Sequence, residues 1–258
     1  MNIRKFLNFE KNYYLFNREE RNLAAIFYYA LLINENLKIF LETIKCDFEI
    51  IPEEFGIYFE YSYLRDLWTY IDGNEKKREL ILKFLKPKNI DFLSSASIKD
   101  FNSYFGAVPK PSSEFIQFPG NWSLSKYEKN INDNEEFLKI CKFKWAFNIK
   151  PDIVIHTSNK NAVCIEAKLE SGEGFYPNNK NECDMFVRRF SSKTHYVRQT
   201  ELQKYLFEEL IGCRTQFLFL VSKNATSKTH ETIFWKEIFS KFNLINCPYF
   251  IRKWIETL

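Results

Sequence analysis

Two apolar runs joined by a polar turn constrain the fold of this chain more than any other feature. The first run, DIVIHT, covers residues 152–157, and the second, AVCIEAKL, covers residues 162–169, with SNKN between them. Short runs rich in Val and Ile on either side of a polar turn predict a β-hairpin. A sheet is therefore expected near the middle of the chain. Its second strand carries Glu166 and Lys168 among apolar residues.

The segments around this hairpin predict a mixed α/β structure. Residues 134–147 predict a helix running into a strand, and residues 197–212 predict a helix that ends at Gly212. In the run TQFLFLVSK (215–223), residues 217–221 are all apolar. A continuous apolar run is typical of a strand inside a sheet. Two further helices are expected at 231–242 and 249–258.

The first 110 residues read mainly as helices. NREERNLAAIFYYALLI (17–33) begins with Asn17 and has Glu20 three residues later, a capping-box pattern. Other helical patterns cover residues 35–44, 61–71 and 74–85. A loop rich in Pro and Ser at 106–122 then marks the expected boundary. We therefore predict a helical N-terminal region (1–110) and an α/β core with C-terminal helices (111–258).

Composition excludes some classes of protein and leaves others open. Hydrophobic residues make up 45% of the 258 residues, as in a globular chain, and the net charge of +4 neither requires nor excludes a nucleic-acid partner. The six cysteines lie far apart without metal-ligand spacing, which argues against a zinc site. No run approaches 18 uncharged apolar residues, so we expect a soluble cytoplasmic protein without a membrane segment.

The charged residues of the hairpin suit metal-assisted chemistry on a phosphodiester. Glu166 and Lys168 are two residues apart in a strand, so their side chains leave the same face. Asp152 begins the neighbouring strand and is expected beside them. Two carboxylates form an oxygen-rich site suited to Mg²⁺ or Mn²⁺, and an adjacent lysine can orient water or offset charge on a phosphate. The alternative is a surface hairpin with an ordinary ion pair.

These residues resemble the signature of the PD-(D/E)XK nuclease superfamily, because Pro151-Asp152 supplies the first part and Glu166-Ala167-Lys168 the second. The resemblance covers roughly residues 134–222. It implies a restriction-endonuclease-like mixed sheet flanked by helices, with core order α-β-β-β-α-β. It also implies that Asp152, Glu166 and the Ala167 carbonyl bind Mg²⁺ or Mn²⁺, and that Lys168 positions the attacking water.

The resemblance extends to residues outside the two-part motif. Members of the superfamily often add a polar residue from the following helix, and Gln199 and Gln203 are one turn apart there. An upstream helix often supplies one more acid, for which Glu20, Glu135 and Glu136 are candidates. For each of these three glutamates, the sequence favours an ordinary solvated or capping role over metal binding. The tyrosine spacing of the RecB-like branch is not reproduced.

A basic segment, expected to be a long loop, follows the motif and is the expected nucleic-acid contact. FVRRFSSKTHYVRQ contains Arg188, Arg189, Lys193 and Arg198 with aromatic residues between them and no acid. Basic residues interleaved with aromatics suit a phosphate backbone. The alternative is a plain solvated face, which a run of charges usually forms.

These expectations lead to one functional hypothesis and one rival. The first is a metal-dependent endonuclease that hydrolyses phosphodiester bonds, with DNA as the expected substrate and restriction or antiviral defence as the role the resemblance implies. The N-terminal region would then recognise substrate, form a homodimer or bind a regulatory protein partner. The rival is a catalytically silent module on the same fold that binds nucleic acid or protein. The intact Asp152, Glu166 and Lys168 favour the enzyme.

Overall fold

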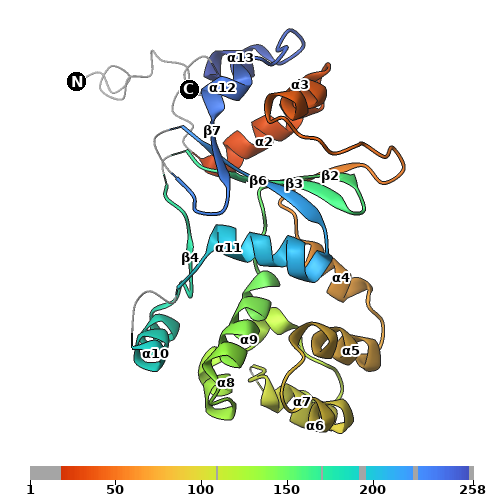
Figure 1. The fold of residues 1–258 in the computed structure, drawn as a ribbon, viewed down its shortest axis with the longest axis vertical. Helices are drawn as coiled ribbons and strands as arrows, with labels where there is room; N and C mark the ends of the chain where they lie inside the picture. Colours follow the sequence, from red (N-terminus) through yellow and green to blue (C-terminus); the bar gives the residue numbers. More distant parts are fainter. Residues whose placement is uncertain (1–18, 109, 170, 192–195, 223–225, 256–258) are drawn as a thin grey trace, which may run out of the picture. The chain divides into compact units, whose positions relative to one another are not determined.

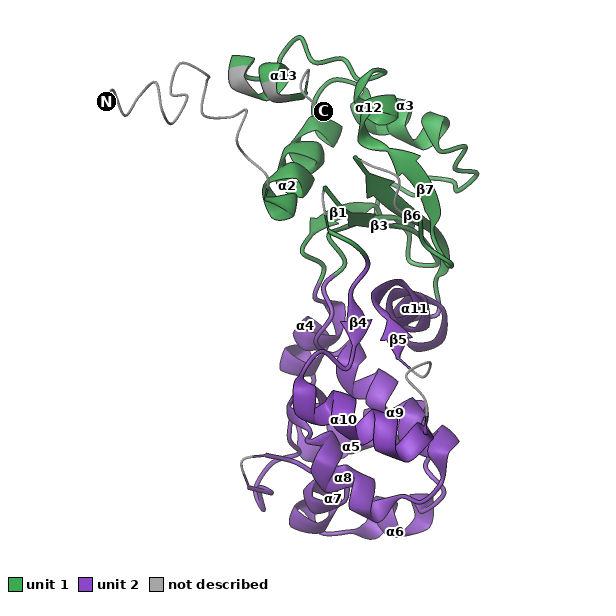
Figure 2. Cartoon of the chain, turned by 90° about the vertical axis from the view of Figure 1, so that its left-hand side faces the viewer, with its two compact units in different colours: residues 1–61, 151–172, 213–258 green, residues 62–150, 173–212 purple. Residues whose placement is uncertain are grey.

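The computed structural model describes residues 19–108, 110–169, 171–191, 196–222 and 226–255. The chain forms two compact units (Figure 2). Unit 1 contains Met1–Tyr61, Pro151–Gly172 and Cys213–Leu258, and unit 2 contains Ser62–Lys150 and Glu173–Gly212. Both units draw on residues before and after position 110, where the sequence placed its boundary. The mixed α/β class predicted from the sequence is confirmed.

Unit 1 is built on a five-stranded mixed sheet of order β1-β2-β3-β6-β7. Its strands are Gly56–Phe59, Ile153–Ser158, Asn161–Ala167, Arg214–Val221 and Glu231–Phe234. β1, β2 and β3 are antiparallel neighbours, whereas β3, β6 and β7 run parallel. The predicted hairpin is confirmed, and its strands pair Ile153 with Ile165 and Ile155 with Val163.

Helices cover one face of this sheet and form the core of unit 1 (Figure 1). They are α2 (Glu20–Leu31), α3 (Asn36–Thr43) and α12 (Trp235–Phe239), and α13 (Tyr249–Ile255) follows near the end of the described chain. Alternate strand residues such as Ile153, Ile155, Val163 and Ile165 point into this core. The residues between them, including Asp152 and Glu166, therefore leave the opposite face.

Two strands of the sheet were not predicted from the sequence. β1 lies between the helices predicted at 35–44 and 61–71, and its four residues pair with β2 from Gly56↔His156 to Phe59↔Ile153. β7 occupies the first four residues of the segment predicted as a helix from 231, and α12 begins only at Trp235. The helix prediction was wrong at these four residues because pairing with an existing strand outweighs a short local pattern.

Unit 2 is mainly helical. Its longer helices are α4 (Tyr63–Tyr70), α5 (Asn74–Leu85), α9 (Asn134–Ala146) and α10 (Lys180–Phe190). The shorter ones are α6 (Ile90–Ser95), α7 (Ile98–Tyr104), η2 (Pro119–Asn121), α8 (Leu124–Tyr127), η3 (Glu128–Asn130), α11 (Gln199–Lys204) and the π-helix η5 (Tyr205–Ile211). Strands β4 (Phe175–Tyr176) and β5 (Val197–Arg198) form a separate antiparallel pair.

In unit 2, two predictions made from the sequence were wrong and one is confirmed. The predicted passage from helix to strand at 134–147 is wrong, because α9 stays helical to Ala146. The basic segment, expected as a loop, contains α10, whose Asn179 side chain caps the helix by accepting from Glu182 N–H. The predicted helix end at Gly212 is confirmed, since Gly212 has a φ of 79°, the left-handed region that glycine favours.

A column of aromatic rings forms much of the core of unit 2. Trp122 stacks on Phe105 at 4.5 Å, Phe105 on Tyr127 at 6.2 Å, and Tyr127 on Phe137 at 5.8 Å, with interplanar angles of 12–14°. All four rings are buried. This column explains the high aromatic content of the chain, since large rings fill the space among many short helices.

No single helix in the described part of the chain is long and apolar enough to cross a membrane. Only α2 and α3 together reach the required length and apolar character, and they are bent by 109° relative to each other.

Candidate active site at the end of the hairpin

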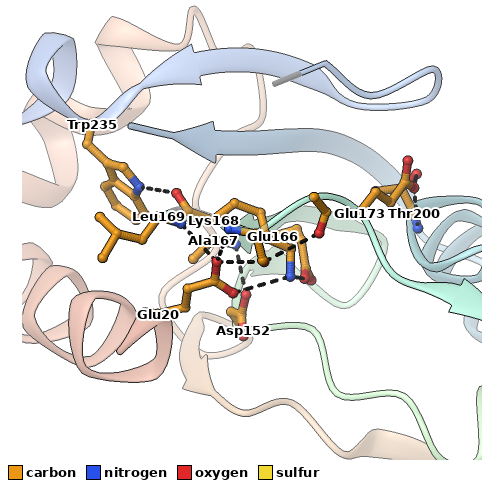
Figure 3. Close-up of polar contacts among 11 residues, drawn as sticks. Glu20, Asp152, Glu166, Ala167, Lys168, Leu169, Glu173, Thr200 and Trp235 are labelled. Atoms are coloured by element: carbon orange, nitrogen blue, oxygen red, sulfur yellow. Dashed lines mark hydrogen bonds and ion pairs between the residues drawn. The ribbon is translucent and has the colours of Figure 1, made fainter. Parts of the chain in front are cut away.

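The predicted motif residues come together at the open end of the hairpin in unit 1 (Figure 3). Asp152 stands immediately before β2, and its Oδ2 accepts a hydrogen bond from Ala167 N–H at 2.8 Å. Because β2 begins only at Ile153, this carboxylate takes the place that a strand backbone would occupy beside Ala167. The expectation that Asp152 lies next to the second strand is confirmed.

Glu166 and Lys168 share one face of the second strand, as predicted. The Lys168 Nζ lies 2.8 Å from Glu166 Oε1, and the Glu166 side chain is only 1% exposed. A buried carboxylate needs a partner for its charge, and Lys168 supplies it. The three side chains thus form a cluster of two acids and one base on the sheet face opposite the apolar core.

The proximity of the acids shifts the pKa values of Asp152 and Lys168. Burial and, next, the charge of Glu166 raise the pKa of the Asp152 carboxyl well above its usual range. Burial alone would lower the pKa of Lys168. The Glu166 charge and hydrogen bond, together with Asp152 and Glu20, outweigh burial and raise it. Lys168 is therefore an ammonium at neutral pH, suited to donating a hydrogen bond rather than to removing a proton.

Glu20 is the one upstream acid of the three candidates that the structure brings to this site. Its Oε1 accepts from Leu169 N–H at 3.1 Å, Ser171 N–H at 3.1 Å and the Ser171 hydroxyl at 2.6 Å. Its Oε2 lies 3.7 Å from Lys168 Nζ. Burial raises the pKa of Glu20, but these hydrogen bonds and Lys168 outweigh burial and lower it.

The capping-box interpretation of Glu20 is not what the structure shows. α2 begins at Glu20 itself, with Glu19 at the N-cap and no side-chain cap, and Asn17 lies outside the described residues. Glu20 is therefore the first helical residue, not the third, and its carboxylate turns to the segment that follows β3. Only the weak hint of an upstream acid pointed to it in the sequence.

Trp235 is a site residue that the sequence analysis missed. Its indole Nε1–H donates to the Lys168 carbonyl at 3.0 Å, while its ring is fully buried. It lies at the junction of β7 and α12, inside a segment predicted as one helix. No local pattern could have found it, because the contact spans 67 positions of the chain.

The residues present fit a hard divalent cation. Asp152 and Glu166 supply two carboxylates. The Ala167 carbonyl leaves the strand on the same side as its N–H, which bonds Asp152. Mg²⁺ is commonly held by one or two carboxylates while it keeps several waters. The described residues contain no group of three or more His, Cys, Asp or Glu side chains arranged to hold a metal, so this donor set depends on the carbonyl and on water.

Gln199 and Gln203 belong to unit 2, on α11. Gln203 is fully buried, and Gln199 N–H donates to Gly174 O at 2.9 Å. Beside them, the deeply buried Glu173 carboxylate accepts from Thr200 N–H and the Thr200 hydroxyl. These contacts fix the start of α11 within its own unit. A catalytic role for the two glutamines stays a prediction.

The predicted nucleic-acid contacts are engaged within unit 2. Arg189 donates to the Ile131 carbonyl at 2.6 Å and to Asn134 Oδ1 at 2.9 Å, and its guanidinium covers the Phe137 ring. Arg188 pairs with Glu128 at 3.2 Å, largely exposed.

The other two predicted nucleic-acid contacts are Arg198 and Lys193. Arg198 pairs with Glu173 at 3.1 Å, and Lys193 lies outside the described residues. The Arg188 side chain is thus more exposed, at 69%, than that of Arg198, at 28%. Binding of nucleic acid by this set stays a prediction.

The remaining upstream candidates, Glu135 and Glu136, lie in the first turn of α9 in unit 2. Glu136 Oε1 accepts from Lys88 N–H at 3.0 Å. Acids in the first turn of a helix complement its dipole, so both have an ordinary structural role.

No protein-family model matches this chain, and neither a curated protein nor a solved structure matches it. A function for the site must therefore follow from its own chemistry.

Proposed function

We propose that this protein is a metal-dependent endonuclease that hydrolyses phosphodiester bonds, with DNA as its substrate. The observation that carries the proposal is the cluster at the hairpin end: Asp152 and Glu166 side by side, with the Lys168 ammonium 2.8 Å from Glu166. A pair of acids that share a low-dielectric site without a matching number of cations is costly for the fold. A bound divalent cation would remove that cost.

Each residue then has a defined task. When bound, Mg²⁺ or Mn²⁺ would supply Lewis-acid polarisation of the scissile phosphate and lower the pKa of a water. Asp152 and Glu166 would hold the ion together with the Ala167 carbonyl. Lys168, held as an ammonium, would orient the attacking water by donating a hydrogen bond and would offset negative charge on the phosphate as the bond breaks.

The order of elements along the chain also supports the proposal. Other elements of both units lie between them, but α2, β1, β2, β3, α11 and β6 occur along the chain in the order α-β-β-β-α-β that the resemblance to the PD-(D/E)XK nucleases implies. The strand before the motif is β1, from residues 56–59, and most of unit 2 lies between β1 and β2. A role in restriction or antiviral defence is the setting we propose on this resemblance.

The experiment is a cleavage assay on supercoiled plasmid, linear duplex, single-stranded DNA and RNA, each with Mg²⁺, Mn²⁺ or EDTA. We expect cutting that requires the metal, is lost in Asp152→Ala and falls to a slow but measurable residual rate in Lys168→Ala. Glu42→Gln, an exposed acid on α3 of the same unit, is the matched control and should cut like wild type.

The competing function is a silent module that binds nucleic acid or protein. It would be favoured if wild type bound DNA with a steep dependence on salt yet never nicked any substrate. Calorimetry of Mn²⁺ binding to wild type and to Asp152→Ala would then show whether the carboxylate pair binds metal at all.

A further inference from the structure

Lys168 is held at three separate atoms by residues that are remote in the sequence. Its backbone N–H donates to Leu220 O of β6 at 2.8 Å, its carbonyl accepts from Trp235 Nε1–H at 3.0 Å, and its Nζ lies between Glu166 and Glu20. β3 ends at Ala167, so Lys168 is the first residue beyond the strand. A residue in that position needs contacts from outside the ladder to stay fixed.

Trp235 supplies the first of these outside contacts. The last register pair of β3 and β6 is Ala167↔Leu220, so beyond it the sheet offers no further backbone donor to Lys168. The Lys168 carbonyl is partly buried, so leaving it without a donor would cost free energy, and the indole N–H removes that cost. The Trp235 ring is itself immobilised, since it packs edge-on against Phe27 at 5.3 Å and stacks with Phe239 at 5.8 Å.

Glu20 supplies the second contact, and its two carboxylate oxygens contact different groups. Oε1 takes all three hydrogen bonds from Leu169 and Ser171, so it fixes the chain immediately after Lys168. Oε2 is the oxygen that lies nearest Lys168 Nζ. A lysine side chain has four rotatable bonds, and opposite charges from two directions restrict where its ammonium can go.

We infer that Trp235 and Glu20 form a clamp that positions Lys168 for the proposed reaction. Trp235 fixes the backbone of Lys168, and Glu20 fixes its ammonium and the following segment. Both are positioning residues, because they act on substrate only through Lys168. Glu20 is assigned this role rather than metal binding because Oε1 already accepts three hydrogen bonds. The inference rests on the proposed function, since a fixed ammonium matters most to a site that orients water.

The test uses Trp235→Phe, which keeps an aromatic ring but loses the N–H donor, and Glu20→Gln, which keeps the shape but loses the charge. Ser171→Ala, at an exposed position, is a milder third variant that removes one hydrogen bond to Glu20. Glu42→Gln is the control. Each is made in the full chain, alone and combined with Lys168→Ala, and near-ultraviolet circular dichroism verifies the fold.

Two measurements distinguish a failure of the clamp from a failure of the proposed nuclease function. The first is hydrogen–deuterium exchange of residues 167–172 in the metal-free protein, which should speed up in the three clamp variants and not in Glu42→Gln. The second is cleavage kinetics. Loss of one contact that positions Lys168 should lower kcat about tenfold with KM nearly unchanged. In the Lys168→Ala background, Trp235→Phe should lower the rate no further, because its effect passes through Lys168.

The outcomes are distinct. Unchanged exchange in folded Trp235→Phe and Glu20→Gln overturns the clamp, as does a full additional loss of rate in the Lys168→Ala background. If Trp235→Phe does not fold, Glu20→Gln and Ser171→Ala decide. If wild type cuts nothing, the proposed function fails, and the exchange data alone decide whether Lys168 is clamped.

Discussion

The Lys168 ammonium lies 2.8 Å from a Glu166 carboxylate that is only 1% exposed. Removing one member of a buried pair leaves the other charge uncompensated, which costs about 3–5 kcal/mol. We therefore expect Lys168→Met to lower the free energy of unfolding by that order. The double variant Lys168→Met/Glu166→Gln should recover part of the loss, because it leaves no unpaired charge.

Urea denaturation of the four proteins in this cycle, in EDTA, measures the coupling directly. A loss in the double variant equal to the sum of the losses in Lys168→Met and Glu166→Gln would mean that the pair does not interact across the 2.8 Å between its charged atoms.

Asp152→Asn should stabilise the metal-free protein at neutral pH. The folded-state pKa of Asp152 is raised above its ordinary 3.8, so between these two pKa values the folded state binds more protons than the unfolded state. Stability contributed by this group is therefore present at low pH and falls as pH rises through that window. Asparagine does not titrate, and its oxygen can still accept from Ala167 N–H. Denaturation from pH 4 to pH 8 in EDTA should show the gain.

Mn²⁺ supplies the complementary measurement on Asp152. The ion should raise the melting temperature of wild type but not of Asp152→Asn, because binding to folded protein stabilises it. A wild-type melting temperature that does not respond to Mn²⁺ or Mg²⁺ would argue against the metal site.

His156 should make unit 1 sensitive to mild acid. Burial lowers the pKa of His156 below the ordinary 6.5, partly offset by a hydrogen bond to the backbone of Ser158, and His156 Nε2 lies 2.8 Å from the Tyr61 hydroxyl. Below pH 6.5 the unfolded state takes up a proton before the folded state does. Stability is thus full above pH 6.5 and is lost as pH falls through the folded-state pKa.

The matched variant is His156→Gln, which keeps an amide to bond Tyr61 and does not titrate. Its stability curve between pH 5 and pH 7 should be flatter than that of wild type. Parallel curves would contradict the assignment.

Arg188 and Arg189 are adjacent but should respond differently to alanine. Arg189 bonds the Ile131 carbonyl and Asn134 and covers Phe137, so Arg189→Ala should lower the free energy of unfolding by about 2 kcal/mol. Arg188 makes one exposed ion pair, for which about 0.5 kcal/mol is expected.

For nucleic-acid binding, Arg188→Ala should have a larger effect than Arg189→Ala, the reverse of their effects on stability. If the basic segment binds DNA, Arg188→Ala should reduce the dependence of log K on log salt by about one phosphate contact. An unchanged salt slope in Arg188→Ala would remove Arg188 from the proposed interface.

The hairpin and its charges could be predicted because they are local. Val and Ile at alternate positions specify the strands, and the two-residue spacing places Glu166 and Lys168 on one face whatever surrounds them. β6 was found for the same reason, since its run of apolar residues is unambiguous.

What the sequence could not reveal depends on contacts across the fold. β1 has only four residues in an acidic segment and becomes a strand through β2. β7 carries apolar residues at spacings that a helix also allows. Glu20 reaches Leu169 across 149 positions, and Trp235 reaches Lys168 across 67. Both contacts depend on tertiary structure, which the periodicity of the sequence does not encode.

The interleaving of the two units determines when each can fold on the ribosome. Unit 2 has all its residues once Gly212 has been made, whereas unit 1 still lacks β6, β7 and α12. The nascent β2–β3 hairpin must therefore wait with the edge of β3 that pairs with β6 still open, a state prone to aggregation. Lys168 meets Trp235 only after β7 and α12 have been made. Any nuclease activity would thus be withheld from the nascent chain until α12 has emerged.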